Sequence, residues 1–328
     1  MRPGAPDRCG RASAAGLAAG ARGVFMGGAR GVFMGGARGV LTGWSRHHGI
    51  SGLPLPSKAW AVAVGLGIAL GATARPVLAQ EDFRSLDAGR PLRITDAYPV
   101  RYLEWEVQFG VRGTLAEAGR GAAGSFELET GLFRNTEFGI GFEPAFSRVA
   151  GRSSTGIESV SSHAMFNFSQ ESWSWPAFSI RLNVESPGGG SLGRQGWEYE
   201  ATAIATRTFA SRTRIHANAG YAAAGLVDGG DYWAGGIAID APVGLFSRLL
   251  AGDVFIEVPV DRGRTRVLTE IGARLQLSNL SVLDIAIGGR LDEWADGRSN
   301  VQLVIGLSRV FGLAGLVRPP RYPNPRID

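Results

Sequence analysis

Along most of the chain, apolar residues alternate with polar or charged residues at every second position. In the stretch FELETGLFRNTEFGIGFEPAF (Phe126 to Phe146), bulky apolar residues take one parity, and glutamates and glycines take the other. Neighbouring side chains of an extended strand point to opposite faces, so this pattern predicts strands with one apolar and one polar face. No segment of useful length after Gln80 shows the period of an amphipathic helix.

The alternation recurs in twelve segments, which predicts an all-β protein. The segments are 101–112, 124–133, 137–147, 158–169, 177–186, 197–209, 214–222, 232–243, 249–258, 266–277, 282–291 and 301–311. In the first segment, Trp105 and Val107 share one face, whereas Glu104 and Glu106 share the other.

The connections between the segments alternate in character. Those after odd-numbered segments are longer and rich in glycine and charge, such as RVAGRSSTG and SPGGGSLGRQG, whereas RNT and ASRT follow even-numbered segments. Long loops on one rim and short turns on the other are typical of outer-membrane barrels. In a bilayer every backbone polar group must pair within the protein, which requires a closed barrel. The sequence therefore predicts a transmembrane up-and-down antiparallel β-barrel of about 12 strands over residues 100–311, in the bacterial outer membrane.

A secreted β-sandwich is the alternative fold, because it would bury the same apolar parity. It does not account for the difference between the two sets of connections. It also leaves unexplained why aromatic residues such as Trp175, Trp197 and Phe209 collect near the predicted strand ends, where interfacial girdles of barrels lie.

The first 79 residues differ chemically from the rest. An eight-residue unit, GARGVFMG, recurs over residues 20–43, which indicates a duplicated stretch or a start assigned too far upstream. Lys58, an apolar run and the small residues before Gln80 then predict a signal peptide over residues 57–79. We expect residues 80–99 to form a periplasmic N-terminal segment too short for a plug, and residues 312–328 to form a proline-rich C-terminal extension.

Charge and cysteine content limit the partners and the kinds of site that the protein can have. Residues 1–79 hold nine basic residues and one acid, so the high isoelectric point belongs to this leader and no nucleic-acid partner is expected. Cys9 is the only cysteine, which excludes disulfides and thiolate metal sites from the remainder.

Three stretches resemble a known family. They are GRPLRITDAYPVRYLEWEVQFG (Gly89 to Gly110), RIHANAGY (Arg214 to Tyr221) and VIGLSRVF (Val304 to Phe311). They are similar to the entry, a middle strand and the closing strand of the outer-membrane barrels called "MetA-pathway of phenol degradation" proteins. The resemblance implies a transporter of small solutes, hydrophobic or aromatic ones included. Expected partners are membrane lipid, the outer-membrane assembly machinery and a small-molecule solute. Barrels usually end on the aromatic residue of the last strand, and the extension after Phe311 departs from that.

The polar parity supplies the candidate functional residues, which should line the lumen. They are Glu104, Glu106, Arg112, Glu127, Glu129, Glu143, Arg181, Glu185, Glu198, Glu200, Asp240, Asp253, Glu257, Glu270, Arg274, Asp284 and Arg290, with His216 and Asn218 as neutral members. Carboxylates far outnumber arginines in this set, so an open lumen would favour cations. We expect Glu104, Glu106, Glu127 and Glu129 to pair in part with Arg112, Arg274 or Arg290. A salt-bridged network that fills a narrow lumen and a polar pathway through it both fit this set.

Catalysis and metal binding have weaker support. His163 and His216 are the only histidines after the leader, and neither has a third ligand at a useful spacing, so no metal or cofactor is expected. Ser161 and His163 share the inward face, whereas Ser162 points outward. The main hypothesis is a channel that passes small solutes without energy input and is not an enzyme. A lipid-acting barrel hydrolase and a structural barrel with a closed lumen are the alternatives.

Overall fold

The computed structural model describes residues 84–224, 230–244, 248–261 and 263–312. The predictions for residues 1–79, for residues 80–83 of the N-terminal segment and for residues 313–328 of the C-terminal extension lie outside the described residues. The strands are β1 (Glu104–Ala116), β2 (Gly119–Thr130), β3 (Thr136–Val149), β4 (Arg152–Ser169), β5 (Ala177–Ser186), β6 (Gly189–Gly190), β7 (Glu198–Thr208), β8 (Arg214–Ala224), β9 (Tyr232–Pro242), β10 (Arg248–Pro259), β11 (Arg266–Ser278), β12 (Ser281–Arg290) and β13 (Asn300–Gly312).

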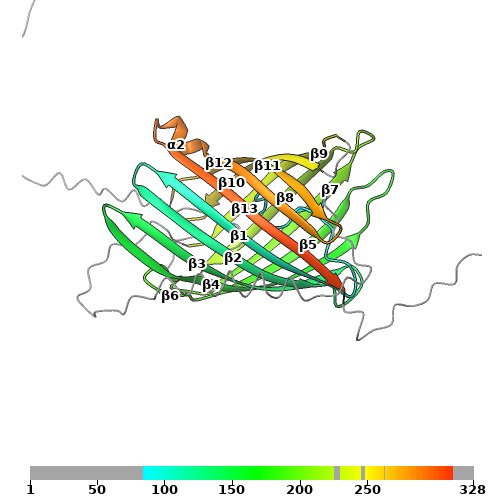
Figure 1. The fold of residues 1–328 in the computed structure, drawn as a ribbon, viewed down its shortest axis with the longest axis horizontal. Coiled ribbons are helices and arrows are strands. Elements are labelled where there is room, and N and C mark those ends of the chain that lie inside the picture. The colour runs from blue at the N-terminus through cyan, green and yellow to red at the C-terminus, as the bar shows by residue number, and fades with distance from the viewer. Residues whose placement is uncertain (1–83, 225–229, 245–247, 262, 313–328) are drawn as a thin grey trace, which may run out of the picture.

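The strands form one antiparallel sheet that closes on itself (Figure 1). β1 pairs with both β2 and β13, and the pairing of β3 with β4 completes the circuit. β6 is a two-residue addition that pairs only with β4. The other twelve strands make a barrel without a free edge, so the predicted fold class is confirmed.

The two faces of the wall differ as the alternation predicts. Ile140, Ile271 and Ile305 point outward and are 60, 69 and 56% exposed, whereas Glu106 and Glu270 point inward and are buried. Exposed apolar side chains continue around the outside of the barrel. A contiguous apolar outer surface of this extent suits the hydrocarbon of a bilayer rather than water.

Two of the predicted long loops are wrong. Only Glu117 and Ala118 separate β1 from β2, and only Ala150 and Gly151 separate β3 from β4. Ala150 and Gly151 both have positive φ, as a tight hairpin turn requires. Glycine and charged residues indicated loops in the sequence, but paired strands that extend past a membrane tolerate both. A longer connection does follow β5, where β6 folds back onto β4, and another follows β12.

The connection between β12 and β13 contains the short helix α2 (Leu291–Ala295). Across the part of the chain that the structure describes, no helix is long and apolar enough to cross a membrane.

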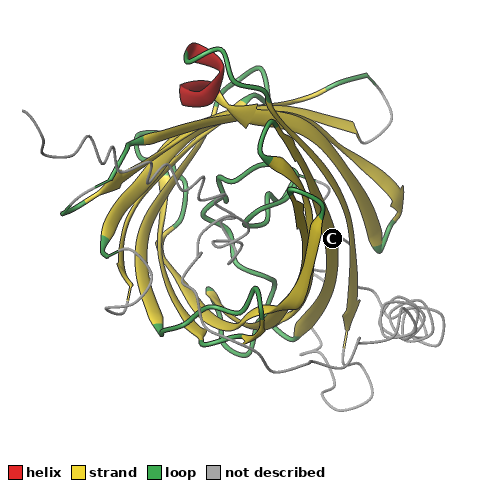
Figure 2. Cartoon of the chain, turned by 90° about the vertical axis from the view of Figure 1, so that its left-hand side faces the viewer, coloured by secondary structure: helices red, strands yellow, loops and turns green. Residues whose placement is uncertain are grey.

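Residues 84–100, which we call the lumen segment, cross the inside of the barrel as irregular chain (Figure 2). Leu86, Leu92 and Ile94 of this segment are fully buried against the inner wall. Residues 80–99 were expected to form a periplasmic segment too short for a plug, whereas the described part of this stretch lies inside the lumen. A chain without regular structure needs few residues to cross a narrow barrel, provided that the wall satisfies its backbone.

Candidate functional site in the barrel lumen

Ion pairs fix the lumen segment to the wall. Arg93 is fully buried; its guanidinium lies 2.8 Å from Glu270, and its backbone amide donates to Asp253 at 2.9 Å. Asp96 pairs with Arg214 at 3.1 Å, and Asp87 pairs with Arg274 at 2.6 Å.

Wall side chains satisfy the backbone of the same segment. The amide of Ala97 donates to Oγ1 of Thr206 at 2.9 Å, and its carbonyl accepts from Ser179 and Asn167. The amide of Val100 donates to Oε2 of Glu137 at 2.9 Å. Buried backbone groups without partners are costly, so these wall residues explain how irregular chain stays inside the barrel.

An apolar patch on the inner wall completes the docking surface. Leu249 and Phe255 of β10 and Leu268 of β11 are fully buried beneath Leu92 and Ile94. These wall residues share parity with the inward acids Asp253, Glu257 and Glu270. Bulky apolar residues on a lumen-facing parity are a sequence signal for an occupant of the lumen, which the alternation of strands alone does not reveal.

The predicted lumen residues lie on the inner face, and most of them are buried. The buried ones are Glu106, Arg112, Glu129, Glu143, Glu185, Glu198, His216, Asn218, Asp240, Asp253, Glu257, Glu270, Arg274, Asp284 and Arg290. Glu104, Glu127, Arg181 and Glu200 are half-buried.

The three arginines that were expected to pair with Glu104, Glu106, Glu127 and Glu129 have other carboxylate partners. Arg112 contacts Glu270, Arg274 contacts Asp284 and Asp87, and Arg290 contacts Asp292 and Glu293. Gln108 instead bridges Glu106 and Glu129, donating at 3.0 and 2.7 Å.

Four arginines outside the predicted set reduce its acidic excess. Arg90 and Arg93 come from the lumen segment, and Arg93 meets Glu270. Arg194, from the connection after β6, pairs with Glu185 at 2.7 Å and Glu198 at 2.8 Å. Arg214 pairs with Asp240 at 2.6 Å. Because these cations neutralise much of the lining, a simple acidic pore is not what the structure contains.

Small cavities remain between the lumen segment and the wall. One of about 50 Å³ is lined by Ala88, Glu127, Glu143, Arg181 and Asn218 among others. A second, of about 40 Å³, also reaches Glu127 and Glu143. Each of these two cavities, formed by described residues, holds room for water or a small ion.

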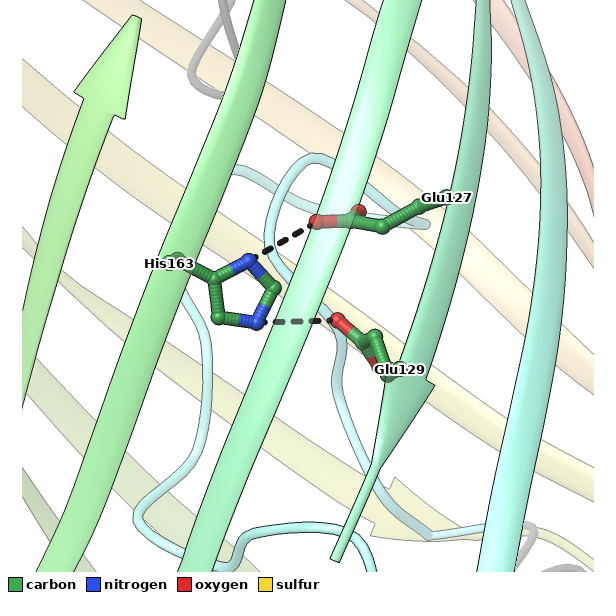
Figure 3. Close-up of side chains that lie close together, drawn as sticks. All are labelled: Glu127, Glu129 and His163. Atoms are coloured by element: carbon green, nitrogen blue, oxygen red, sulfur yellow. Dashed lines mark ion pairs between the residues drawn. The ribbon is translucent and has the colours of Figure 1, made fainter.

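His163 lies at the centre of a group of carboxylates (Figure 3). Its Nδ1 is 3.0 Å from Glu127, and its Nε2 is 3.4 Å from Glu129 and 3.0 Å from Glu137. Arg181 lies beside the ring, with Nη2 2.9 Å from Nδ1. Spacing along the chain offers His163 no third ligand, whereas the fold brings carboxylates from two other strands to its ring.

Strand register explains how this group forms. Gly139 of β3 is aligned with Glu129 of β2 on one side and with His163 of β4 on the other. A Cβ at Gly139 would lie 2.1 Å from the imidazole ring, so glycine leaves the space that the ring fills. Spacing along the chain cannot show such a cluster, because its members come from three strands.

His216 takes part in a separate buried chain. Its Nδ1 lies 3.0 Å from Thr206 Oγ1, and its Nε2 lies 2.8 Å from Asp240. This order resembles a hydroxyl–imidazole–carboxylate triad, but all three side chains are buried and the threonine oxygen accepts the amide of Ala97. The arrangement anchors the lumen segment and offers no hydroxyl to a substrate.

Outside the strands, Glu171 ties the lumen segment to the connection between β4 and β5. Partial burial opposes its ionisation, but hydrogen bonds from the amide and hydroxyl of Thr208 and from the hydroxyl of Tyr98 lower the pKa of Glu171. The ionised form of Glu171 is therefore the one that this contact stabilises.

Known structures share this architecture. The COG4313 outer membrane channel from Pseudomonas putida F1 matches with a TM-score of 0.53 and 12% identity, over 66% of this chain and 98% of that one. The fold is that of an outer-membrane β-barrel. Single-chain barrels of this kind belong to the bacterial outer membrane, so the predicted location is confirmed at the level of the fold.

Two further structures match less closely. The KdgM porin has a TM-score of 0.43 and 12% identity, over 62% of this chain and 99% of that one. The translocator domain of the autotransporter NalP from Neisseria meningitidis has a TM-score of 0.42 and 13% identity, over 77% and 98%. No protein-family model and no curated protein matches the sequence. Membership of the phenol-degradation family stays a prediction.

Proposed function

We propose that this protein is an outer-membrane channel that passes small solutes without energy input. The observation that carries the proposal is a closed barrel with an apolar outer face and an interior of ionisable side chains. A purely structural barrel could fill its core with apolar residues at lower cost, since burying charges requires matched partners. Membrane lipid and the assembly machinery are the partners that such a barrel needs.

The position of the lumen segment determines which solutes can cross the barrel. The segment occupies the lumen beside cavities of about 50 and 40 Å³, so we expect the passage of larger solutes to require the segment to shift. The larger of the two cavities is lined by polar and charged side chains, among them Glu127, Glu143, Arg181 and Asn218. Such a lining suits small polar solutes, whereas the hydrophobic or aromatic class rests on the family resemblance alone.

Solute flux into liposomes tests the proposal. The wild-type protein should admit small neutral solutes slowly, and a variant that weakens the docking of the lumen segment, Arg93→Met, should admit them faster. Arg264→Met is the matched control, because Arg264 pairs with Asp296 on the exposed surface. If neither the wild type nor Arg93→Met passes any solute while both are folded, the channel proposal fails.

A closed structural barrel is the second candidate. The apolar contacts of Leu92 and Ile94 with the wall favour it, because they hold the segment in the lumen independently of charge. Absence of flux even after the segment is undocked would select this candidate. We assign no enzymatic step to the barrel, since its imidazoles face carboxylates and a buried threonine.

A further inference from the structure

We propose that His163, Glu127 and Glu129 bind a divalent transition-metal cation in the lumen, with Glu137 as an adjacent carboxylate. One ligand atom from each of His163, Glu127 and Glu129 lies within 4.8 Å of the others. Figure 3 shows both glutamates of β2 directed at the ring of His163, which reaches them across β3.

The separations suit a metal centre. A zinc-type ion with bonds of about 2.0–2.2 Å in tetrahedral geometry holds its ligand atoms about 3.3 Å apart. Nε2 of His163 lies 3.4 Å from Glu129 and 3.0 Å from Glu137, whereas Glu127 lies 3.0 Å from Nδ1 of the same ring. One ion bonds to one ring nitrogen, so an ion on Nε2 meets Glu129 at once and requires the carboxylate of Glu127 to turn toward it. Closing the site around a cation therefore needs side-chain adjustments and no rearrangement of the wall.

Groups outside the cluster already orient its carboxylates. Gln108 donates to Oε2 of Glu129 at 2.7 Å, and the amide of Val100 donates to Oε2 of Glu137 at 2.9 Å. In both residues Oε1 is the oxygen left facing the imidazole. Metal sites use such outer hydrogen bonds to fix the direction of their ligands.

The local charge favours a divalent ion. Glu127, Glu129 and Glu137 carry three negative charges when ionised, and Arg181, 3.5 Å from Glu127, supplies one positive charge. A neutral imidazole with a bound divalent ion brings the sum to zero. Without metal, a proton on His163 would cancel only one of the two remaining negative charges. Metal and proton bind the same ring nitrogen, so they compete for it.

A cavity lies beside the cluster. Glu127 lines the cavity of about 50 Å³ together with Glu143. Glu143 is 7% exposed, and its Oε2 has no hydrogen-bond partner within the described residues. An unpartnered buried carboxylate oxygen beside the cluster is an independent sign that this space accommodates a cation. The mixed nitrogen and oxygen ligands favour zinc or nickel over calcium or magnesium.

Zinc titration of the folded full-length chain in detergent tests the site. The background carries Cys9→Ser, His47→Gln and His48→Gln, which remove other soft ligands from the leader. After chelator treatment and dialysis, this protein should bind one zinc ion per chain, measured by elemental analysis and by competition with a colorimetric chelator. Glu129→Gln and His163→Gln should each weaken binding about tenfold or more.

Two matched controls separate the site from general effects. His216→Gln changes the other lumen histidine and should leave zinc binding unchanged. Gly139→Ala should displace the His163 ring and weaken binding, whereas Gly113→Ala, whose added Cβ meets nothing within 4 Å, should not. Heat-modifiable migration on gels confirms that each variant is folded.

The proposal is overturned if the background protein binds no zinc at about 100 μM, or if Glu129→Gln, Gly139→Ala and His163→Gln all bind zinc as the background does. The first result would mean that the cluster holds no metal, and the second would mean that the bound zinc lies elsewhere in the protein. The readout is metal content, so it is independent of whether the barrel conducts.

Discussion

Replacing Arg93 by methionine should release the lumen segment while the barrel stays folded. The side chain of Arg93 is fully buried, and its guanidinium faces Glu270 and Gln302. Methionine keeps much of the length and the apolar contact but removes the charge. Glu270 then retains Arg112 as a partner.

The size of the effect follows from these contacts. Removing one partner of a buried ion pair costs about 3–5 kcal/mol, because it leaves a buried charge uncompensated. Since Arg112 still neutralises part of Glu270, we take the lower end, about 3 kcal/mol. Each 1.4 kcal/mol is about a tenfold change in an equilibrium. The undocked population of the segment should therefore rise by about a hundredfold.

Hydrogen exchange detects this change locally. The amides of Arg93, Ala97 and Val100 donate to wall side chains, so peptides from residues 84–100 should exchange about a hundredfold faster in Arg93→Met. Peptides from the barrel strands should be unchanged, because local opening reports only the segment that opens. Arg264→Met, at an exposed pair, should change neither. Unchanged exchange in the segment, or equal acceleration in segment and strands, would refute a separately docked segment.

Three further predictions address the lipid face of the barrel wall, the rim of the barrel that lies outside the cell, and the connection after β4. Ile140→Arg places a cation on the lipid face and should destabilise the barrel by about 2–4 kcal/mol in urea unfolding; an effect near zero would mean that the faces are reversed. A tag within Ser186 to Gly196 should be labelled on intact cells, whereas a tag within Ala210 to Thr213 should not, and the opposite result would invert the topology. Glu171→Gln should destabilise the fold at neutral pH. The pKa of Glu171 is lowered in the folded state, so its contribution is present above its ordinary value of 4.5 and fades as the pH falls below it. A difference between wild type and variant that persists unchanged at pH 3 would contradict this role.

The strands could be predicted from the sequence because their signal is local. Alternation with period two identifies a strand and its lipid face without knowledge of any partner. Twelve such segments and the need to pair every backbone group in a bilayer then lead to a closed barrel. The inward parity of Glu129, Glu270 and Arg274 followed from the same rule.

Strand ends were harder to predict. Glycine and charged residues around Gly119 and Arg152 fit an exposed strand as well as a loop. Outside the membrane neither face of a strand needs to be apolar, so the alternation no longer distinguishes the two. Only the hydrogen bonds between β1 and β2, and between β3 and β4, show that these residues continue the sheet.

The contents of the lumen were decided by tertiary structure alone. The lumen segment is irregular, so no periodicity marks it, and its place depends on wall residues far along the chain, such as Asp253 and Thr206. The surroundings of His163 depend on the register of three strands, which brings Glu129 across Gly139 to the ring. The sequence determined which side chains face inward, because strand geometry is local. Which of them meet was decided by closure and register, because those contacts join residues that the chain itself keeps apart.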